Sequence, residues 1–282
     1  MDNINNNEPV CYVILTTVRS GSSLLCDLLK NSGIFQCPHS HYEILYSEAL
    51  KEQCPKQCKG NIHEYFSTAL KLSSMQYKNK IIQGLKILSV QLQELSRSFD
   101  NSLKDFTHIL PINTKFILLN RHNIHDQAIS FYKAMYTGVW SGETEDQVFF
   151  NGAAIDNVFW LLKRRKKYLN NFIVQNSLYP KEIEYETFVH DFEGTIKSIF
   201  DYLELPAPQN KIIKTRFVRQ YDSLSKSLSH QYSIYTKKTV IERKFKWLFY
   251  ILLQVLYKLS AILRKNSRIY SKFIDFLKRK IR

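Results

Sequence analysis

Short apolar runs alternate with helical patterns along most of the chain. Residues 10–17 read VCYVILTT, a continuous apolar run rich in β-branched side chains, which is typical of a strand buried on both faces of a parallel sheet. Residues 22–31 follow at once with leucines at the spacing of one helical face, and Gly33 marks the end of that helix. The pattern predicts a strand, a tight turn and a helix.

The same alternation recurs further along the chain. Apolar runs that predict strands follow at residues 80–90 (around Lys86), 115–119 and 183–185. Helical patterns follow Asn120 through Tyr136, cover residues 159–170 with a basic face, and cover residues 194–203. Because single strands alternate with helices, we expect a three-layer α/β fold with a central parallel sheet.

Composition narrows the class of protein. With 44% hydrophobic residues, 13% aromatic residues, eight glycines and seven prolines, the chain is neither collagen-like nor largely disordered. The five cysteines are odd in number, and Cys11 and Cys26 lie in apolar segments, which favours free thiols in a reducing compartment. The first nine residues carry neither a basic region nor a long apolar run, so we expect no secretory signal and a cytoplasmic location.

The positive charge is concentrated near the C-terminus. Residues 236–282 contain fourteen Lys or Arg against Glu242 and Asp275, so +12 of the chain's formal charge of +15 lies there. The remainder is close to neutral, which disfavours a nucleic-acid-binding body. We therefore expect a globular domain over residues 1–235 and a basic tail over residues 236–282.

The tail has the composition of a membrane-surface helix. Residues 247–263 are apolar but are interrupted by Gln254 and Lys258, which share one helical face, and basic runs flank them at 243–246 and 264–268. The segment is short and polar for a transmembrane span. A helix lying on an anionic membrane surface, on the cytosolic side, fits the pattern best. A helix packed on a partner or on the body, and a short transmembrane hairpin, are the alternatives.

The turn after the first strand has the composition of an anion site. Amides that converge on a helix N-terminus favour a phosphate, Gly21 allows close approach, and Arg19 adds a bidentate cation. Ser20, Ser22 and Ser23 offer hydroxyls and helix caps. The stretch lacks the pattern G-x-x-x-x-G-K-[ST], which disfavours nucleoside triphosphate chemistry. An ordinary strand-to-helix turn with a capping serine is the alternative.

These residues also carry a resemblance to a known family. T-x-x-R-S-G-S-S-L-L, at residues 16–25, resembles the 5′-phosphosulfate loop of sulfotransferases that use 3′-phosphoadenosine 5′-phosphosulfate (PAPS), in the Arg form of the bacterial trehalose 2-sulfotransferases. Residues 119–140 resemble that family's R-x-N-x-x-x-Q-A-x-S-x-x-x-A-x-x-T-x-x-W segment. The resemblance implies a P-loop NTPase-like sulfotransferase fold and a 3′-phosphate held by Arg121 and Ser130. The other matching positions are Asn123, Gln127, Ala128, Ala134, Thr137 and Trp140.

Weaker similarities extend the match to roughly residues 9–232. Gly84-Leu85-Lys86 resembles the family's G-x-K strand and residues 183–186 its I-x-Y-E, while Arg216 and Arg219 fall where the family has basic residues that bind the cofactor. Physical reasoning agrees for Arg121, since it follows an apolar run and so lies at the carboxyl end of a parallel strand, where such sheets bind ligands.

The segment that should supply the catalytic base departs from the family. The family reads G-E-P-x-E-x-x there, and its second Glu is the base, whereas residues 36–43 read QCPHSHYE. Matched on the proline, the two family glutamates fall on Cys37 and Ser40. The nearby replacements are, in the order we favour, His41, Glu43 and His39. Each is also interpretable as a loop or capping side chain.

The sequence thus predicts an enzyme that moves a sulfuryl group from PAPS to a hydroxyl of a carbohydrate, with Arg19 and the loop amides serving the leaving phosphate. The basic tail suggests a glycolipid or lipid-linked sugar as acceptor. Cys54, Cys58 and His63 form only a weak zinc pattern, and we expect no metal. The alternatives are a small-molecule kinase of the same fold and a non-catalytic protein that binds anions or membranes, or nucleic acid through its tail.

Overall fold

The computed structural model describes residues 8–35, 62–98, 106–140, 148–208 and 223–237, together with Leu248 and Leu252. Several predicted features lie outside the described residues. These are the candidate bases His39, His41 and Glu43, the predicted cofactor ligands Arg216 and Arg219, and nearly all of the tail.

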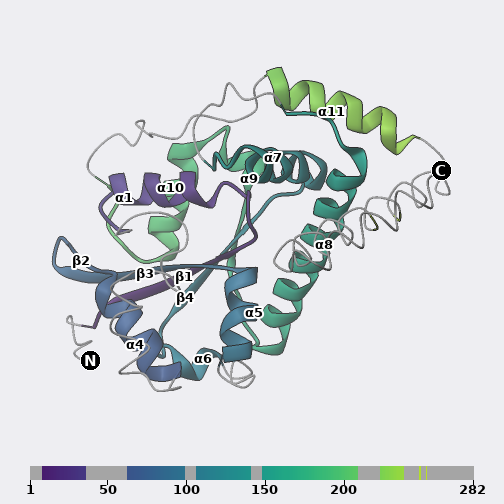
Figure 1. The fold of residues 1–282 in the computed structure, drawn as a ribbon. Coiled ribbons are helices and arrows are strands. Elements are labelled where there is room, and N and C mark those ends of the chain that lie inside the picture. Colours follow the sequence, from purple (N-terminus) through teal and green to yellow (C-terminus); the bar gives the residue numbers. More distant parts are fainter. Residues whose placement is uncertain are drawn as a thin grey trace, which may run out of the picture.

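Within the described residues, the strands form one five-stranded sheet in the order β2-β3-β1-β4-β5 (Figure 1). The central strand β1 (Val10–Thr16) pairs in parallel with β3 (Lys80–Leu88) and with β4 (Lys115–Asn120), and β5 (Lys181–Glu184) pairs in parallel with β4. These four strands confirm the predicted ones. The edge strand β2 (Ser74–Tyr77) is antiparallel to β3 and was not predicted, so the sheet is mostly rather than wholly parallel.

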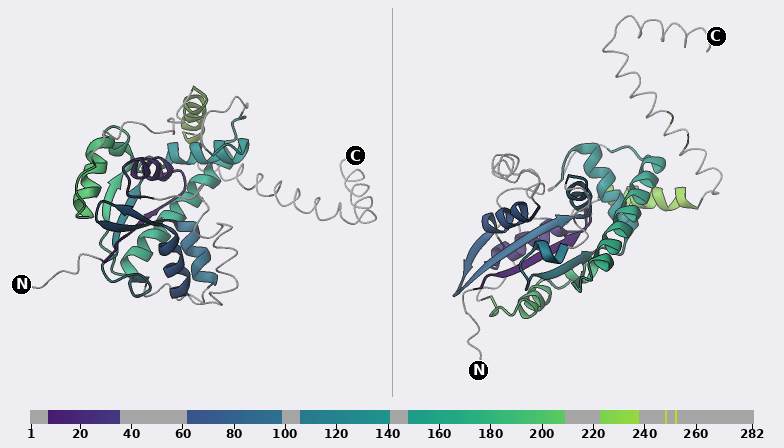
Figure 2. Two further views of the ribbon diagram at one scale, coloured as in Figure 1. Left: turned by 90° about the vertical axis from the view of Figure 1, so that its left-hand side faces the viewer. Right: turned by 90° about the horizontal axis from the view of Figure 1, so that it is seen from below.

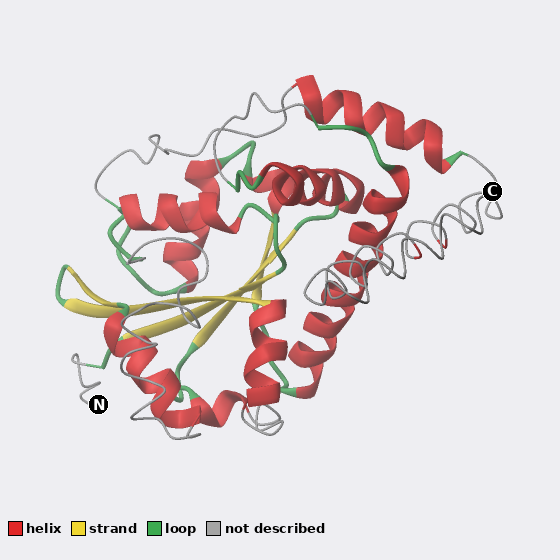
Figure 3. Ribbon diagram, viewed as in Figure 1, coloured by secondary structure: helices red, strands yellow, loops and turns green. Residues whose placement is uncertain are grey.

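Helices cover both faces of the sheet, as predicted (Figure 3). On one face lie α1 (Ser22–Asn31) and α10 (Phe192–Tyr202), the latter preceded by the short α9 (Tyr185–Phe188). On the other face lie α4 (Ile62–Leu72), α5 (Ser89–Ser98), α6 (Phe106–Ile109) and the second half of α8 (Gly152–Gln175). The right-hand view of Figure 2 shows the sheet between these two layers.

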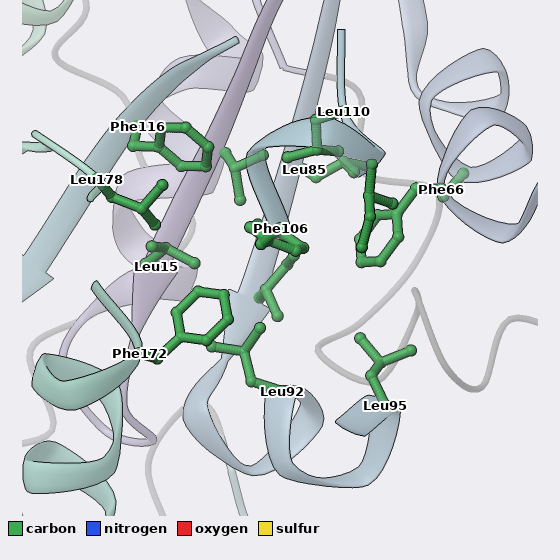
Figure 4. Packing of buried hydrophobic residues seen from close by; sticks show 14 of the residues in the cluster. Leu15, Phe66, Leu85, Leu92, Leu95, Phe106, Leu110, Phe116, Phe172 and Leu178 are labelled. Carbon is green, nitrogen blue, oxygen red and sulfur yellow. The ribbon is translucent and has the colours of Figure 1, made fainter. Parts of the chain in front are cut away.

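The apolar runs account for the two cores. Along β1, Val13 and Leu15 point into one cluster and Tyr12 and Ile14 into the other, because successive side chains of a strand face opposite sides. In the first cluster, Figure 4 shows the ring of Phe106 among its neighbours; its centroid lies 5.3 Å from that of Phe66, 6.2 Å from Phe116 and 5.1 Å from Phe172. The central strand is thus buried on both faces, as its sequence predicted.

A third apolar cluster joins α7 (Ile124–Thr137), the first half of α8 and α11 (Ser223–Thr236), which lie together in Figure 1. Helix α8 begins seven residues before the predicted start, because the side chain of Asn151 caps it by accepting a hydrogen bond of 3.0 Å from the amide of Ala154. Helix α11 was not predicted. This packing holds α7 against the carboxyl ends of the central strands.

Candidate active site

The carboxyl ends of the three central strands meet at the loop between β1 and α1. Thr16 is opposite Leu88 of β3 and Leu119 of β4. Its hydroxyl donates to the carbonyl of Leu119 at 2.7 Å, and its Oγ1 lies 2.6 Å from Oγ of the fully buried Ser20. The hydroxyl of Ser20 therefore links the loop to the end of β1.

Gly21 turns the loop into α1. Its φ is +86°, in the left-handed region, and a Cβ built on it would lie 2.4 Å from Cδ2 of Tyr185. Both the backbone and the ring therefore require glycine here. Gly21 is the N-cap of α1 and has no side chain that could accept a capping hydrogen bond, so the predicted serine does not occupy the N-cap position. Ser22 and Ser23 lie in the first turn instead.

The start of α1 also has a characteristic charge distribution. The first turn of α1 contains no acidic residue, so the positive end of the helix dipole has no carboxylate from that turn beside it. An anion that approached the loop would meet this positive end and the first backbone amides of the helix. Anion binding by this loop stays a prediction.

The structure brings the loop and the second motif into contact through arginine. Arg19, with a φ of 59°, donates from Nε to Oγ of Ser130 at 3.0 Å and from Nη1 to the carbonyl of Trp140. Arg121 donates from Nη1 to the carbonyl of Arg19 at 3.1 Å. Arg19, Arg121 and Ser130, predicted from two segments about a hundred residues apart, therefore form one cluster.

The cluster is strongly electropositive. Burial, together with the charge of Arg121, lowers the pKa of Arg19 to about 10. Two guanidinium groups held this close repel each other, and a bound dianion would relieve that repulsion. Arginine pairs are also well suited to phosphate and sulfate, since each guanidinium donates in a planar fork.

Two residues of the segment after β5 support Arg121. Its Cζ lies 4.4 Å from the ring centroid of Tyr185, the same ring that meets Gly21. The carboxylate of Glu186 accepts hydrogen bonds from the amides of His122 (3.1 Å) and Asn123 (3.0 Å). Burial alone would raise the pKa of Glu186, but these amides and the charge of Arg121 hold it below its ordinary value.

Lys166 of α8 also reaches this edge, where its Nζ donates to the carbonyl of Arg121 at 3.3 Å. Burial lowers its pKa, and the charge of Glu186 acts in the opposite direction. Sequence reasoning did not single out Tyr185, Glu186 or Lys166. The I-x-Y-E similarity could have indicated the first two. Lys166 is one of five consecutive basic residues, and no local sequence pattern distinguishes it from the other four.

Other residues of the second motif orient the loop. Gln127 donates from Nε2 to Oγ1 of Thr17 at 2.9 Å and to the carbonyl of Val18 at 2.7 Å. Asn123 caps α7 by accepting a hydrogen bond of 3.0 Å from the amide of Asp126. Gln127 thus fixes α7 relative to the loop, whereas Asn123 stabilises the start of α7 itself.

The remaining candidates are only partly covered by the structure. Lys86 of the G-x-K segment is buried on β3, opposite Ile14 of β1. His63 lies in α4, whereas Cys54 and Cys58 lie outside the described residues. Among the residues that are described, no group of three or more His, Cys, Asp and Glu side chains could hold a metal ion.

Comparison with known proteins agrees with this geometry. The family model of the Stf0 sulphotransferases matches residues 11–234. The chain belongs to this family. It is therefore a sulfotransferase, and the matched region contains both motifs of the arginine cluster. The match ends two residues before the predicted start of the basic tail.

Similar proteins include two mycobacterial enzymes and one domain of known structure. The trehalose 2-sulfotransferase of Mycolicibacterium smegmatis is 19% identical over 229 residues, 70% of this chain and 85% of that protein. The trehalose 2-sulfotransferase of Mycobacterium tuberculosis is 20% identical over 221 residues, 67% of this chain and 82% of that protein. The sulfotransferase domain from the curacin biosynthetic pathway is 17% identical, with a TM-score of 0.39 over 79% of this chain and 83% of that domain.

The structure also bears on the predicted relation to membranes. None of the helices in the described ranges has both the length and the apolar character that a membrane crossing requires.

Proposed function

We propose that this sulfotransferase takes the sulfuryl group of PAPS and transfers it to a hydroxyl of a carbohydrate. The observation that carries the proposal is the hydrogen bond from Arg19 Nε to Ser130 Oγ, with Arg121 bonded to the same loop. It joins the predicted phosphosulfate loop to the predicted 3′-phosphate ligands. A nucleotide with phosphates at both its 5′ and 3′ positions suits two such adjoining anion sites.

The residues present fit this donor. Gly21 leaves the loop without a side chain at the helix N-terminus, and the first turn of α1 adds amides without a carboxylate. We assign the 5′-phosphosulfate to the loop from Arg19 to Ser23 and the 3′-phosphate to Arg121 and Ser130. Arg216 and Arg219 stay predicted as further ligands of the donor.

PAPS supplies a sulfuryl group already bonded to a good leaving phosphate. Transfer forms a bond between the acceptor oxygen and sulfur and breaks the bond between sulfur and the phosphate oxygen. Arg19 and the loop amides stabilise the negative charge that develops on the leaving phosphate. A base must remove the acceptor proton, and His41, Glu43 and His39 remain our candidates in that order.

The proposed acceptor rests on the names of the two mycobacterial enzymes and on the composition of the predicted tail. Trehalose is the acceptor in the names of the two mycobacterial enzymes, which supports a sugar hydroxyl. The family glutamates fall on Cys37 and Ser40 here, so we propose an acceptor other than free trehalose. Because residues 236–282 are basic and amphipathic, we propose that the enzyme associates peripherally with an anionic membrane and sulfates a glycolipid or lipid-linked sugar.

Transfer of radiolabelled sulfate tests the proposal directly. The purified chain is incubated with labelled PAPS and either trehalose or membrane glycolipids, and labelled products are separated. We expect label in glycolipid products and none with Arg121→Ala, while Lys167→Ala, an exposed change on α8, retains activity. Label in trehalose alone would contradict the acceptor proposal. A parallel incubation with ATP labelled in its terminal phosphate tests the donor, and transfer from ATP but not from PAPS would contradict it.

A further inference from the structure

A groove of about 310 Å³ lies between the second half of α7 and the first half of α8. Met135 and Tyr136 of α7 and Val158 and Leu161 of α8 line it, with Asn157 as a polar member. The helical period turns these α7 side chains away from Ser130, which faces the phosphate loop. The groove is therefore separate from the proposed donor site.

Large apolar side chains around this groove are exposed. The exposed fractions are 49% for Met135, 51% for Tyr136, 69% for Phe149 and 55% for Trp160. Phe149 is held at the groove because its carbonyl accepts a hydrogen bond of 2.6 Å from the hydroxyl of Tyr132. Trp160 lies one helical turn after the groove residue Asn157 and is therefore its neighbour on the surface of α8. Gathering of such side chains on one surface marks an interaction site.

Two cations lie beside Trp160. The ammonium of Lys163 lies 5.0 Å from the ring centroid of Trp160, and Arg164 is exposed one turn beyond this tryptophan. After Asp156, which is buried and bonded to Tyr232, α8 contains no acidic residue. Aromatic rings beside Lys and Arg are typical of surfaces that lie at lipid headgroups, where the rings enter the interface and the cations meet anionic lipids.

The start of the basic tail lies beside this surface. The ring of Tyr235, near the end of α11, packs against Gly152 at the start of α8, where a Cβ would lie 2.6 Å from it. Its ring centroid is also 6.2 Å from that of Phe150, the neighbour of Phe149. In Figure 1, the end of α11 and the start of α8 lie at the same side of the molecule. Thr236 ends α11 and Lys237 follows it, so the first two residues of the predicted tail lie close to the start of α8.

From these observations we infer that the body itself has a lipid face, formed by Met135, Tyr136, Phe149, Trp160, Lys163 and Arg164, which lies on an anionic phospholipid bilayer. The inference rests on the proposed membrane association and identifies the part of the folded domain that meets the lipid. The aromatic rings enter the headgroup region while the two cations meet its negative surface. The tail and the lipid face then bind the same membrane, so each raises the effective concentration of the other.

Co-sedimentation with vesicles tests this face in the full chain. Vesicles of phosphatidylcholine with phosphatidylglycerol are compared with vesicles of phosphatidylcholine alone. We expect Phe149→Ser and Trp160→Ser each to weaken binding to the anionic vesicles about tenfold, since each removes a large apolar side chain from the interface. Arg164→Gln should weaken it about fivefold, and only for the anionic vesicles.

Tyr179→Ser is the matched control, because Tyr179 follows the other end of α8 and is 87% exposed. It should bind vesicles like the wild type. All variants should bind adenosine 3′,5′-bisphosphate equally, which separates this inference from the donor proposal. Wild-type binding by the Phe149→Ser/Trp160→Ser double variant would overturn the lipid face and leave the tail proposal intact. Failure of the unaltered chain to bind any vesicle, or a dimer held together by Phe149 and Trp160, would overturn the lipid face as well.

Discussion

Replacement of Gly21 by alanine tests the link between the phosphate loop and the segment after β5. The new Cβ would lie 2.4 Å from Cδ2 and 2.6 Å from Cε2 of Tyr185, on a backbone with a φ of +86°. The left-handed conformation costs a non-glycine residue about 1–2 kcal/mol. Displacing the ring adds about 1–3 kcal/mol of overpacking, so we expect a loss of roughly 2–5 kcal/mol in the free energy of unfolding.

Gly138 provides the matched control. Its φ is +72°, yet a Cβ there would meet no atom within 4 Å, so Gly138→Ala should show the backbone cost of about 1–2 kcal/mol alone. For a domain of this size, 1 kcal/mol lowers Tm by about 2–4 °C. We therefore expect Gly21→Ala to lower Tm by clearly more than Gly138→Ala in thermal unfolding followed by circular dichroism.

A second substitution separates the backbone cost from the cost of displacing the tyrosine ring. In a Tyr185→Ala background the ring is absent, so the additional cost of Gly21→Ala should fall to that of Gly138→Ala. Because Tyr185 also lies beneath the guanidinium of Arg121, Gly21→Ala should in addition weaken binding of adenosine 3′,5′-bisphosphate. Equal losses of stability for Gly21→Ala and Gly138→Ala, in the presence of Tyr185, would refute the argument.

Three further predictions concern a carboxylate, a helix cap and a buried thiol. The pKa of Glu186 is lower in the folded chain, so its ionised form stabilises the fold above the ordinary glutamate pKa, and this contribution is lost as the pH falls through the folded pKa. In urea unfolding, Glu186→Gln should therefore lose less stability than the wild type as the pH is lowered. An equal loss of stability with pH for both proteins would contradict this. Asn151→Ala removes the cap of α8 and should cost about 1 kcal/mol in urea unfolding, whereas no loss would show that the cap is dispensable. Burial raises the pKa of Cys26 to about 11, so mass spectrometry should find it unalkylated by iodoacetamide in the folded chain at pH 8 and alkylated in urea, and rapid labelling without urea would contradict its burial.

Most of the sheet could be predicted because local patterns specify it. The run at β1 is apolar at every buried position except Thr16, and its end at the glycine turn fixes where α1 begins. Strand β2 and helix α11 could not be predicted in the same way. Strand β2, SMQY, is a partly exposed edge whose side chains alternate weakly, and the serine-rich α11 is stabilised by the contacts of Leu228, Tyr232 and Tyr235 with α7 and α8.

The candidate site likewise contains residues that the sequence predicts and contacts that it does not. Arg19, Arg121 and Ser130 stand in motifs, and Arg121 directly follows a buried strand, so their type and place were predictable. The contact of Tyr185 with Gly21 depends on β5 lying beside β4 in the register that pairs Asn120 with Glu184, which no local pattern specifies. The N-cap of α1 is glycine rather than serine because the tight turn needs a left-handed residue at that position.

Calorimetric titration with adenosine 3′,5′-bisphosphate tests the central claim most directly. The wild type, Arg19→Ala, Arg121→Ala and the exposed control Lys167→Ala are each titrated with the bisphosphate, with ADP and with magnesium ATP. We predict that the wild type and Lys167→Ala bind the bisphosphate most tightly and that both arginine changes weaken it by roughly tenfold to a hundredfold, as the loss of charged hydrogen bonds requires. Preference for magnesium ATP, or bisphosphate binding that neither arginine change weakens, would contradict the proposed donor site.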